Sequence, residues 1–171
     1  MSKSAPSNGN DYSLLCPVPC EHIESALETC LKQDKVAFGS QMQEMFYDVH
    51  QELGFRQLIP SGRRVLIFVS QSGSKLAKSK YFKGPCASFE ATYVQWEALE
   101  SKKRNDGTHP FPRFRPASTL ATDTAFLGFW EVSDLRPLIP PIPLSDLVVH
   151  STKAKVSSTP RHPMFVSDRA A

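Results

Sequence analysis

Residues 64–69 read RVLIFV, and this short run decides how the rest of the chain is interpreted. Five of its six side chains are apolar, and they do not alternate with polar ones. A strand that is apolar at successive positions is covered on both faces, which is typical of the centre of a sheet. The sequence therefore predicts a central strand here, entered through a turn at Pro60, Ser61 and Gly62.

Further strands are predicted on both sides of this run. Residues 86–96 alternate between apolar and polar side chains, which indicates a strand with one buried face. Residues 12–16, 35–39 and 127–135 are apolar runs of strand length. The last three predicted strands along the chain, at 64–69, 86–96 and 127–135, follow one another without helices between them. We therefore expect them to pair in a largely antiparallel way.

Two helices are predicted before the central strand. Residues 21–31 place their apolar side chains on one side at helical spacing. Residues 42–53 carry a second apolar stripe, and Ser40 with Gln43 forms the capping-box pattern that begins a helix. The predicted fold class is α+β, with a twisted, largely antiparallel, barrel-like sheet flanked by two main helices.

Composition divides the chain into a domain and two tails. Residues 1–10 are rich in Ser and Asn, and residues 150–171 lack apolar periodicity, so both are predicted to be disordered. Residues 11–149 form the predicted single domain. Within it, residues 97–124 are interpreted as a long basic and aromatic insertion, and residues 136–143 as a proline-rich connector.

Overall composition restricts the class of protein. The chain has 171 residues, of which 40% are hydrophobic, enough to form a core. It contains no apolar run of membrane-spanning length and no secretory signal, so we expect a soluble, intracellular, cytoplasmic protein without a membrane partner. Its four cysteines are too few and too scattered for a disulfide scaffold. The net charge of +3 is compatible with a nucleic-acid partner but does not require one.

Catalytic motifs are absent from the sequence. It has no G-x-S-x-G, no H-E-x-x-H and no phosphate-binding loop of the Walker type. Cys16, Cys20 and His22 lie close together, but their spacing fits no ordinary zinc site. We therefore predict no catalytic residue, no metal and no cofactor.

The 97–124 insertion interleaves positive charges with aromatic rings. Basic groups bind phosphates and flat rings stack on bases, so this pattern favours contact with RNA or DNA. An alternative stays open, in which Phe111 and Phe114 attach the loop to the core and residues 102–104 are a solvated tip. The predicted nucleic-acid-binding residues are Lys102, Lys103, Arg104, Arg113 and Arg115.

Several residues are candidates for a base-binding pocket. The turn at Gly39 and Ser40 offers backbone N–H groups at the start of a predicted helix, where an anion or a base acceptor binds well. The Ser40 hydroxyl has the simpler alternative role of a helix cap. Trp130 has the alternative role of a core side chain. The predicted pocket residues are Gly39, Ser40, Ser70, Trp96, Phe111, Phe114 and Trp130.

Three segments of the chain resemble the PUA-like superfamily, and within it the EVE-type domains. They are CPVPCEHIESALE with KVAFGS (16–28 and 35–40), IPSGRRVLIFVSQSG (59–73), and GFWEVSDLRPLIPPIPLSDL (128–147), with ASFEATYVQW (87–96) between the last two. Arg63 stands where the family usually has an acid, and the 97–124 insertion departs from its compact form. The resemblance implies a domain that binds nucleic acid and holds a modified base in a pocket between the first helices and the barrel.

The resulting hypothesis is a nucleic-acid-binding module that reads a modified or flipped base in an aromatic pocket. Two alternatives remain open. Relatives with the ASCH pattern are hydrolases, for which Glu90 and Lys83 are the candidate groups here. A protein-interaction adaptor would instead use the RPLIPPIP connector and the two tails as docking segments for a protein partner.

Overall fold

The structure is a computed structural model that describes residues 12–40, 59, 61–70, 80–103, 114–120 and 126–167. Seven strands form one mostly antiparallel sheet in the order β2-β5-β4-β3-β1-β7-β6. Among the described residues, β2 and β6 are the outer strands, and no pairing between them closes the sheet into a barrel. The α+β class is therefore confirmed, as an open sheet with two helices, α1 and α3.

The N-terminal half of the described chain follows the predicted order of elements. β1 spans Ser13–Pro19, α1 spans Cys20–Gln33, and β2 spans Lys35–Ser40. The apolar side of α1 is buried at Ile23, Ala26 and Cys30, as helical spacing requires. The helix ends at Asp34, whose left-handed conformation is a common way to stop a helix. The predicted helix at 42–53 lies outside the described residues.

The central strand is covered on both faces, as predicted. β3 spans Arg64–Ser70 and pairs in parallel with β1 and antiparallel with β4. Val65, Ile67 and Val69 belong to the core cluster that includes the buried side of α1. Leu66 and Phe68 belong to a second cluster, which the C-terminal residues Leu144, Leu147 and Val156 complete. One strand thus separates two apolar layers.

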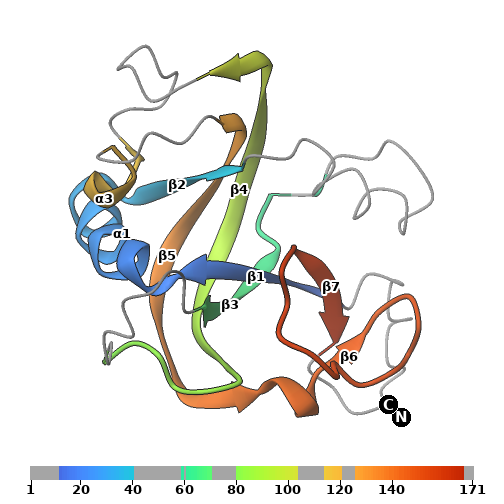
Figure 1. Cartoon of the computed structure of the whole chain (residues 1–171). Helices are drawn as coiled ribbons and strands as arrows, with labels where there is room; N and C mark the ends of the chain where they lie inside the picture. Colours follow the sequence, from blue (N-terminus) through green and yellow to red (C-terminus); the bar gives the residue numbers. More distant parts are fainter. Residues whose placement is uncertain are drawn as a thin grey trace, which may run out of the picture.

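β4 (Cys86–Lys103) and β5 (Phe126–Pro143) are longer than predicted and run side by side along much of the molecule (Figure 1). The insertion predicted to begin at residue 97 therefore begins as a strand. Residues 136–143, expected to form a connector, are the second half of β5. Prolines are tolerated there because the pairing with β2 stops at Ser133, which leaves β5 with β4 as its only described neighbour.

The prediction of a disordered tail at 150–171 is wrong for its described part. Beyond the 3-10 turn η2 (Leu144–Asp146) and β6 (Val148–Val149), the chain returns as β7 (Met164–Ser167), which pairs with β1. Phe165 and Val166 are fully buried and point into different core clusters. This apolar run is only three residues long, too short to show a periodicity in the sequence.

The second helix of the described chain is α3 (Ala117–Leu120), a single turn inside the predicted insertion. It contacts α1, and Figure 1 shows the two helices together at one side of the sheet. β6 and β7 lie near the opposite end of β1 in the same view. No helix in the described part of the chain is long and apolar enough to cross a membrane.

Candidate functional site

A pocket lies at the carboxyl ends of β1 and β3, the parallel pair of the sheet. Pro17 pairs with Phe68, and Pro19 pairs with Ser70. Alternate residues of a strand share a face, so these four side chains continue the face that Leu15 and Leu66 begin in the core. The pocket has a volume of about 520 Å³ and is lined by Pro17, Pro19, Phe68, Ser70, Phe82, Thr159, Pro160 and Arg161.

The lining combines apolar surfaces with a few polar groups. Phe68 is buried in the second core cluster, and Phe82 is a partly buried ring that packs against this cluster. Ser70 and Thr159 bring hydroxyl groups, and Arg161 brings a positive charge. An apolar cavity with a few polar groups is the usual form of a small-ligand site. This combination suits a flat ring that carries or adjoins an anionic group.

The segment that completes the pocket is basic. Residues 147–167 contain no Asp or Glu. Lys153, Lys155, Arg161 and His162 are exposed. Pro160 and Pro163 are buried on either side of the pair Arg161–His162, which holds that pair at the surface. The segment thus offers positive charge without the carboxylates that would compete for it.

Backbone hydrogen bonds give the lysine turn of this segment a defined shape. The Val149 N–H donates to the Ala154 carbonyl at 2.8 Å, and the Lys153 N–H donates to the Val149 carbonyl at 2.9 Å. The His150 N–H donates to the Phe165 carbonyl at 2.9 Å, which ties the turn to β7. The basic side chains are therefore presented from ordered backbone rather than from the disordered tail expected from the sequence.

Among the predicted pocket residues that the structure describes, only Ser70 lines this pocket. Trp130 is a core side chain, packed at 4.6 Å from the Phe38 ring centroid. Trp96 lies against Gly128, where an added Cβ would come within 2.4 Å of its ring. Gly39 lies equally close to the Phe126 ring, and Ser40 is buried at the end of β2. Gly39 and Gly128 therefore leave room for the rings of Phe126 and Trp96 to pack on the sheet.

Arg115 is not placed as a phosphate ligand would be. Its side chain is 3% exposed, and its guanidinium lies over the rings of Phe126 and Phe129, at 5.2 and 5.5 Å from their centroids. One nitrogen, Nη2, donates to the Thr119 carbonyl at 3.0 Å. Burial lowers the pKa of Arg115 to about 10. We therefore correct the prediction: this cation stabilises the fold of the insertion.

Of the other predicted binding residues of the insertion, the structure describes the side chain of Phe114 but not those of the rest. Phe114 packs beside Ala37, Phe126 and Phe129, with the Lys35 ammonium 5.8 Å from its centroid, so this ring does attach the segment to the core. Lys102 and Lys103 end β4, but their side chains lie outside the described residues. Outside them also lie Arg104, Phe111 and Arg113.

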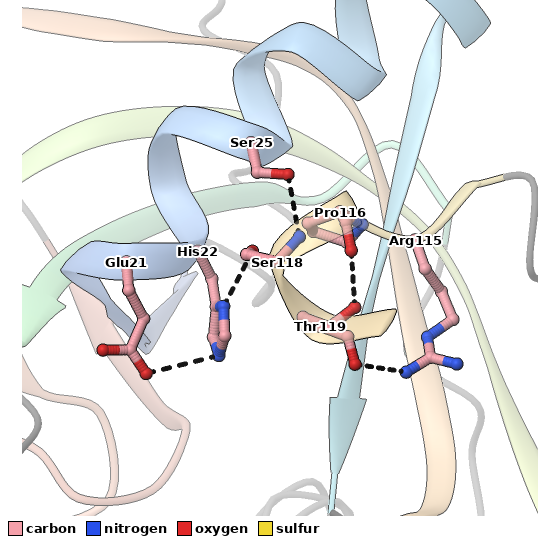
Figure 2. Close-up of polar contacts among 7 residues, drawn as sticks. All are labelled: Glu21, His22, Ser25, Arg115, Pro116, Ser118 and Thr119. Carbon is pink, nitrogen blue, oxygen red and sulfur yellow. Dashed lines mark hydrogen bonds and ion pairs between the residues drawn. The ribbon is translucent and has the colours of Figure 1, made fainter. Parts of the chain in front are cut away.

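A polar cluster joins α1 to α3 (Figure 2). His22 Nδ1 lies 2.9 Å from Ser118 Oγ, and His22 Nε2 lies 3.7 Å from a carboxylate oxygen of Glu21. The Ser118 N–H donates to Ser25 Oγ at 3.2 Å. Burial lowers the pKa of His22, although Glu21 opposes this, so the imidazole is neutral at neutral pH.

A neutral histidine beside a serine hydroxyl is the pairing that activates a nucleophile. Neither His22 nor Ser118 lines the pocket at the ends of β1 and β3 or the pocket beside Leu27 and Leu135. The cluster instead connects α3 to α1 through two hydrogen bonds. Together with the Arg115 contacts, it holds residues 114–120 against the sheet.

Of the two groups suggested for a hydrolase, Lys83 is exposed, whereas Glu90 is held by two arginines. Arg64 and Arg136 each place a guanidinium nitrogen 2.9 Å from a carboxylate oxygen of Glu90. Burial raises the pKa of Glu90, but the hydrogen bonds from the two arginines outweigh this and lower it. A carboxylate held in this way is a poor general acid. Among the described residues, no cluster of His, Cys, Asp and Glu could hold a metal ion.

No protein-family model and no curated protein matches this chain. The pocket and the basic segment are therefore the basis on which a function can be argued. Sequence reasoning missed Phe82, Thr159 and Arg161. A signal was present, since residues 147–167 combine several basic residues with no acidic one, but the lack of apolar periodicity led to their being interpreted as a tail.

Proposed function

We propose that the protein is a nucleic-acid-binding module that holds one unstacked base in the pocket at the ends of β1 and β3. The observation that supports this is the composition of the pocket, which is lined by two phenylalanine rings and by Arg161. An aromatic ring contributes about 1–3 kcal/mol when a base stacks on it. Arg161 would bind the phosphate of the same or the neighbouring nucleotide.

The basic segment extends this site along a strand of nucleic acid. Lys153 and Lys155 are exposed on the turn that follows β6, in the same carboxylate-free stretch as Arg161. Contacts of this kind fix the position of a strand without reading its sequence. Selectivity for a base, plain or modified, would come from the hydroxyl groups of Ser70 and Thr159 at the pocket.

The PUA-like, EVE-type assignment belongs to the same proposal. The order strand, helix, strand over β1, α1 and β2 supports it, as do the positions of β3, β4 and β5 at the other segments that carry the resemblance. This assignment also implies a barrel-like closure of the sheet, beyond the open sheet that the described residues form. The proposed base pocket lies beside the C-terminal segment, whereas the family resemblance implied one beside the first helices.

Binding of short single-stranded RNA and DNA, with and without a modified base, tests the proposal when affinity is measured by fluorescence anisotropy at several salt concentrations. Arg161→Gln should weaken binding and reduce the slope of log affinity against log salt by about one unit. Lys32→Gln is the matched control, because it removes the same charge from the exposed side of α1. An unchanged affinity and slope in Arg161→Gln would overturn the proposal.

A further inference from the structure

A second pocket lies at the C-terminal end of α1. It has a volume of about 380 Å³ and is lined by Leu27, Cys30, Leu31, Asp34, Asp134 and Leu135. Leu27, Cys30 and Leu31 follow the spacing i, i+3 and i+4 along α1, so they share one side of the helix, and Asp34 follows the end of the helix. The last two come from β5. An apolar wall of leucines therefore meets two carboxylates.

Both aspartates of this pocket have a backbone conformation that is unusual for residues other than glycine. Asp34 has φ 60° and Asp134 has φ 53°, in the left-handed region that few residues other than glycine adopt. The Ser133 hydroxyl lies 3.2 Å from one carboxylate oxygen of Asp134. The C-terminal end of α1 adds partial negative charge from its carbonyl groups. Lys32 is in the last turn of the helix but does not line the pocket.

The apolar part of the pocket continues onto the surface. Leu31 is 86% exposed, although it is a large aliphatic side chain on a helix that buries Ile23, Ala26 and Cys30. A single exposed leucine is ordinary, but here it borders a pocket whose other apolar residues are Leu27, Cys30 and Leu135. A ligand that covered Leu31 would remove this surface from water.

We propose that this pocket docks a basic segment of a partner protein. An aliphatic side chain of that segment contacts Leu27, Leu31 and Leu135, and a neighbouring lysine or arginine binds Asp34 and Asp134. The charge of the surface supports this choice, because Glu21, Glu24 and Glu28 are also exposed on α1. Phosphates would be repelled here, so nucleic acid is not the occupant.

The proposal does not depend on the nucleic-acid function. The two pockets are lined by different elements and no residue is common to them. One is positively charged and the other negatively charged. A protein partner at α1 therefore leaves the β1–β3 pocket accessible, and the chain can bind both partners at once.

Titration of the full ¹⁵N-labelled chain with the peptide acetyl-Leu-Lys-Lys-Leu-Lys-Lys-amide tests the docking site by NMR. We expect saturable shifts at the amides of the pocket residues. The variant Asp34→Asn/Asp134→Asn should bind at least about tenfold more weakly. Asparagine tolerates the left-handed conformation, so this variant keeps the backbone. Glu97→Gln/Asp146→Asn removes the same charge at two exposed positions outside α1 and outside the pocket, and should bind within about twofold of the parent.

Leu31→Ser separates the two parts of the proposal. It should weaken binding of the leucine-containing peptide but not binding of hexalysine, because hexalysine has no uncharged aliphatic side chain to contact Leu31. Equal affinity of the peptide for the parent and for Asp34→Asn/Asp134→Asn would overturn the proposal. Concentration-dependent dimerisation that this variant abolishes would also overturn it, in favour of a second copy as the occupant. Shifts of the same amides by an oligonucleotide would do so as well.

Discussion

Two described regions of this molecule, the C-terminal segment and α1, carry opposite charge, although the chain as a whole is nearly balanced. The C-terminal segment has no carboxylate between residues 147 and 167, whereas α1 exposes Glu21, Glu24 and Glu28 and ends beside Asp34 and Asp134. A net charge of +3 hides this division. The difference teaches that the sign of charge around each pocket, rather than the total, indicates which partner each pocket suits.

The largest expected effect is a loss of stability, and it tests whether β7 holds the basic C-terminal segment against the sheet. Phe165 is fully buried between β1 and the rest of the core, so Phe165→Ala should lower the free energy of unfolding by about 3–5 kcal/mol. Ile23→Ala, at a fully buried position of α1, should cost about 2–5 kcal/mol. Urea denaturation measures both changes.

The two substitutions should differ in where the native state opens. Hydrogen exchange of the amides at 148–156 should accelerate more in Phe165→Ala than in Ile23→Ala, because the turn of the basic segment is bonded to the Phe165 backbone. Equal acceleration in both variants would show that the basic segment does not depend on β7 in particular.

The next effect concerns ligand binding on the basic side. Phe82→Ala should weaken single-stranded oligonucleotide binding by about 1–3 kcal/mol, the usual loss when a stacking ring is removed. Tyr81→Ala is the matched control, because Tyr81 packs against the other core cluster and lies 5.8 Å from Phe89. Fluorescence anisotropy measures both affinities. Parallel losses in the two variants would indicate a general disturbance rather than a stacking contact.

A smaller effect is expected on the acidic side, at the contact between α1 and α3. His22→Ala removes the hydrogen bond to Ser118 and should lower the free energy of unfolding by about 1 kcal/mol. The lowered pKa of His22 means that the unfolded state takes up a proton first as pH falls. Its contribution to stability is complete above the unfolded pKa of about 6.5 and is lost as pH falls below it.

The pH dependence of His22 can be isolated by comparison. The urea midpoint of the parent should fall between pH 7 and pH 5, and His22→Gln should show a smaller fall because it cannot be protonated. Arg161→Gln, on the other side of the molecule, serves as the control and should keep the pH dependence of the parent. An identical pH profile for His22→Gln and the parent would remove His22 as the source.

The smallest effect is expected at Glu90, between the two sides. Arg64 and Arg136 are partly exposed, so solvent screening limits the loss in Glu90→Gln to about 0.5–1 kcal/mol. The pKa of Glu90 is lowered, so its stabilisation is present above the unfolded pKa and is lost as pH falls through the folded value. Thermal unfolding at neutral and acidic pH measures this. A larger loss at acidic pH than at neutral pH would contradict the assignment.

The elements that sequence predicted well are those with a long, regular pattern. RVLIFV was identified as a strand covered on both faces, and the apolar spacing of 21–31 identified α1 to within two residues at each end. The order of strands in the sheet was not predictable, because β7 joins β1 through a run of only three apolar residues. The continuation of β5 through its prolines depends on where β2 stops, which no local pattern shows.

The candidate site was predicted less well than the fold. Ser70 was included, but Phe82 and Arg161 were not, because they meet only through the pairing of β1, β3 and β7. Arg115 was interpreted as a phosphate ligand from its charge and its aromatic neighbours. The same two properties describe a guanidinium buried over Phe126 and Phe129, and only tertiary structure distinguishes the two.

The pairing of β1 with β7 has a consequence for how the protein is made. Leu14 pairs with Phe165, so this contact closes a loop that contains nearly all of the described chain. Contacts so distant in sequence form late, after local helices and hairpins. During synthesis, the edge of β1 that receives β7 stays unpaired until β7 has left the ribosome, and the wall that carries Thr159 and Arg161 is completed at the same step. A chain that stopped before residue 159 would expose this edge of β1 and lack this pocket wall, so we expect it also to lack the nucleic-acid binding proposed for the pocket.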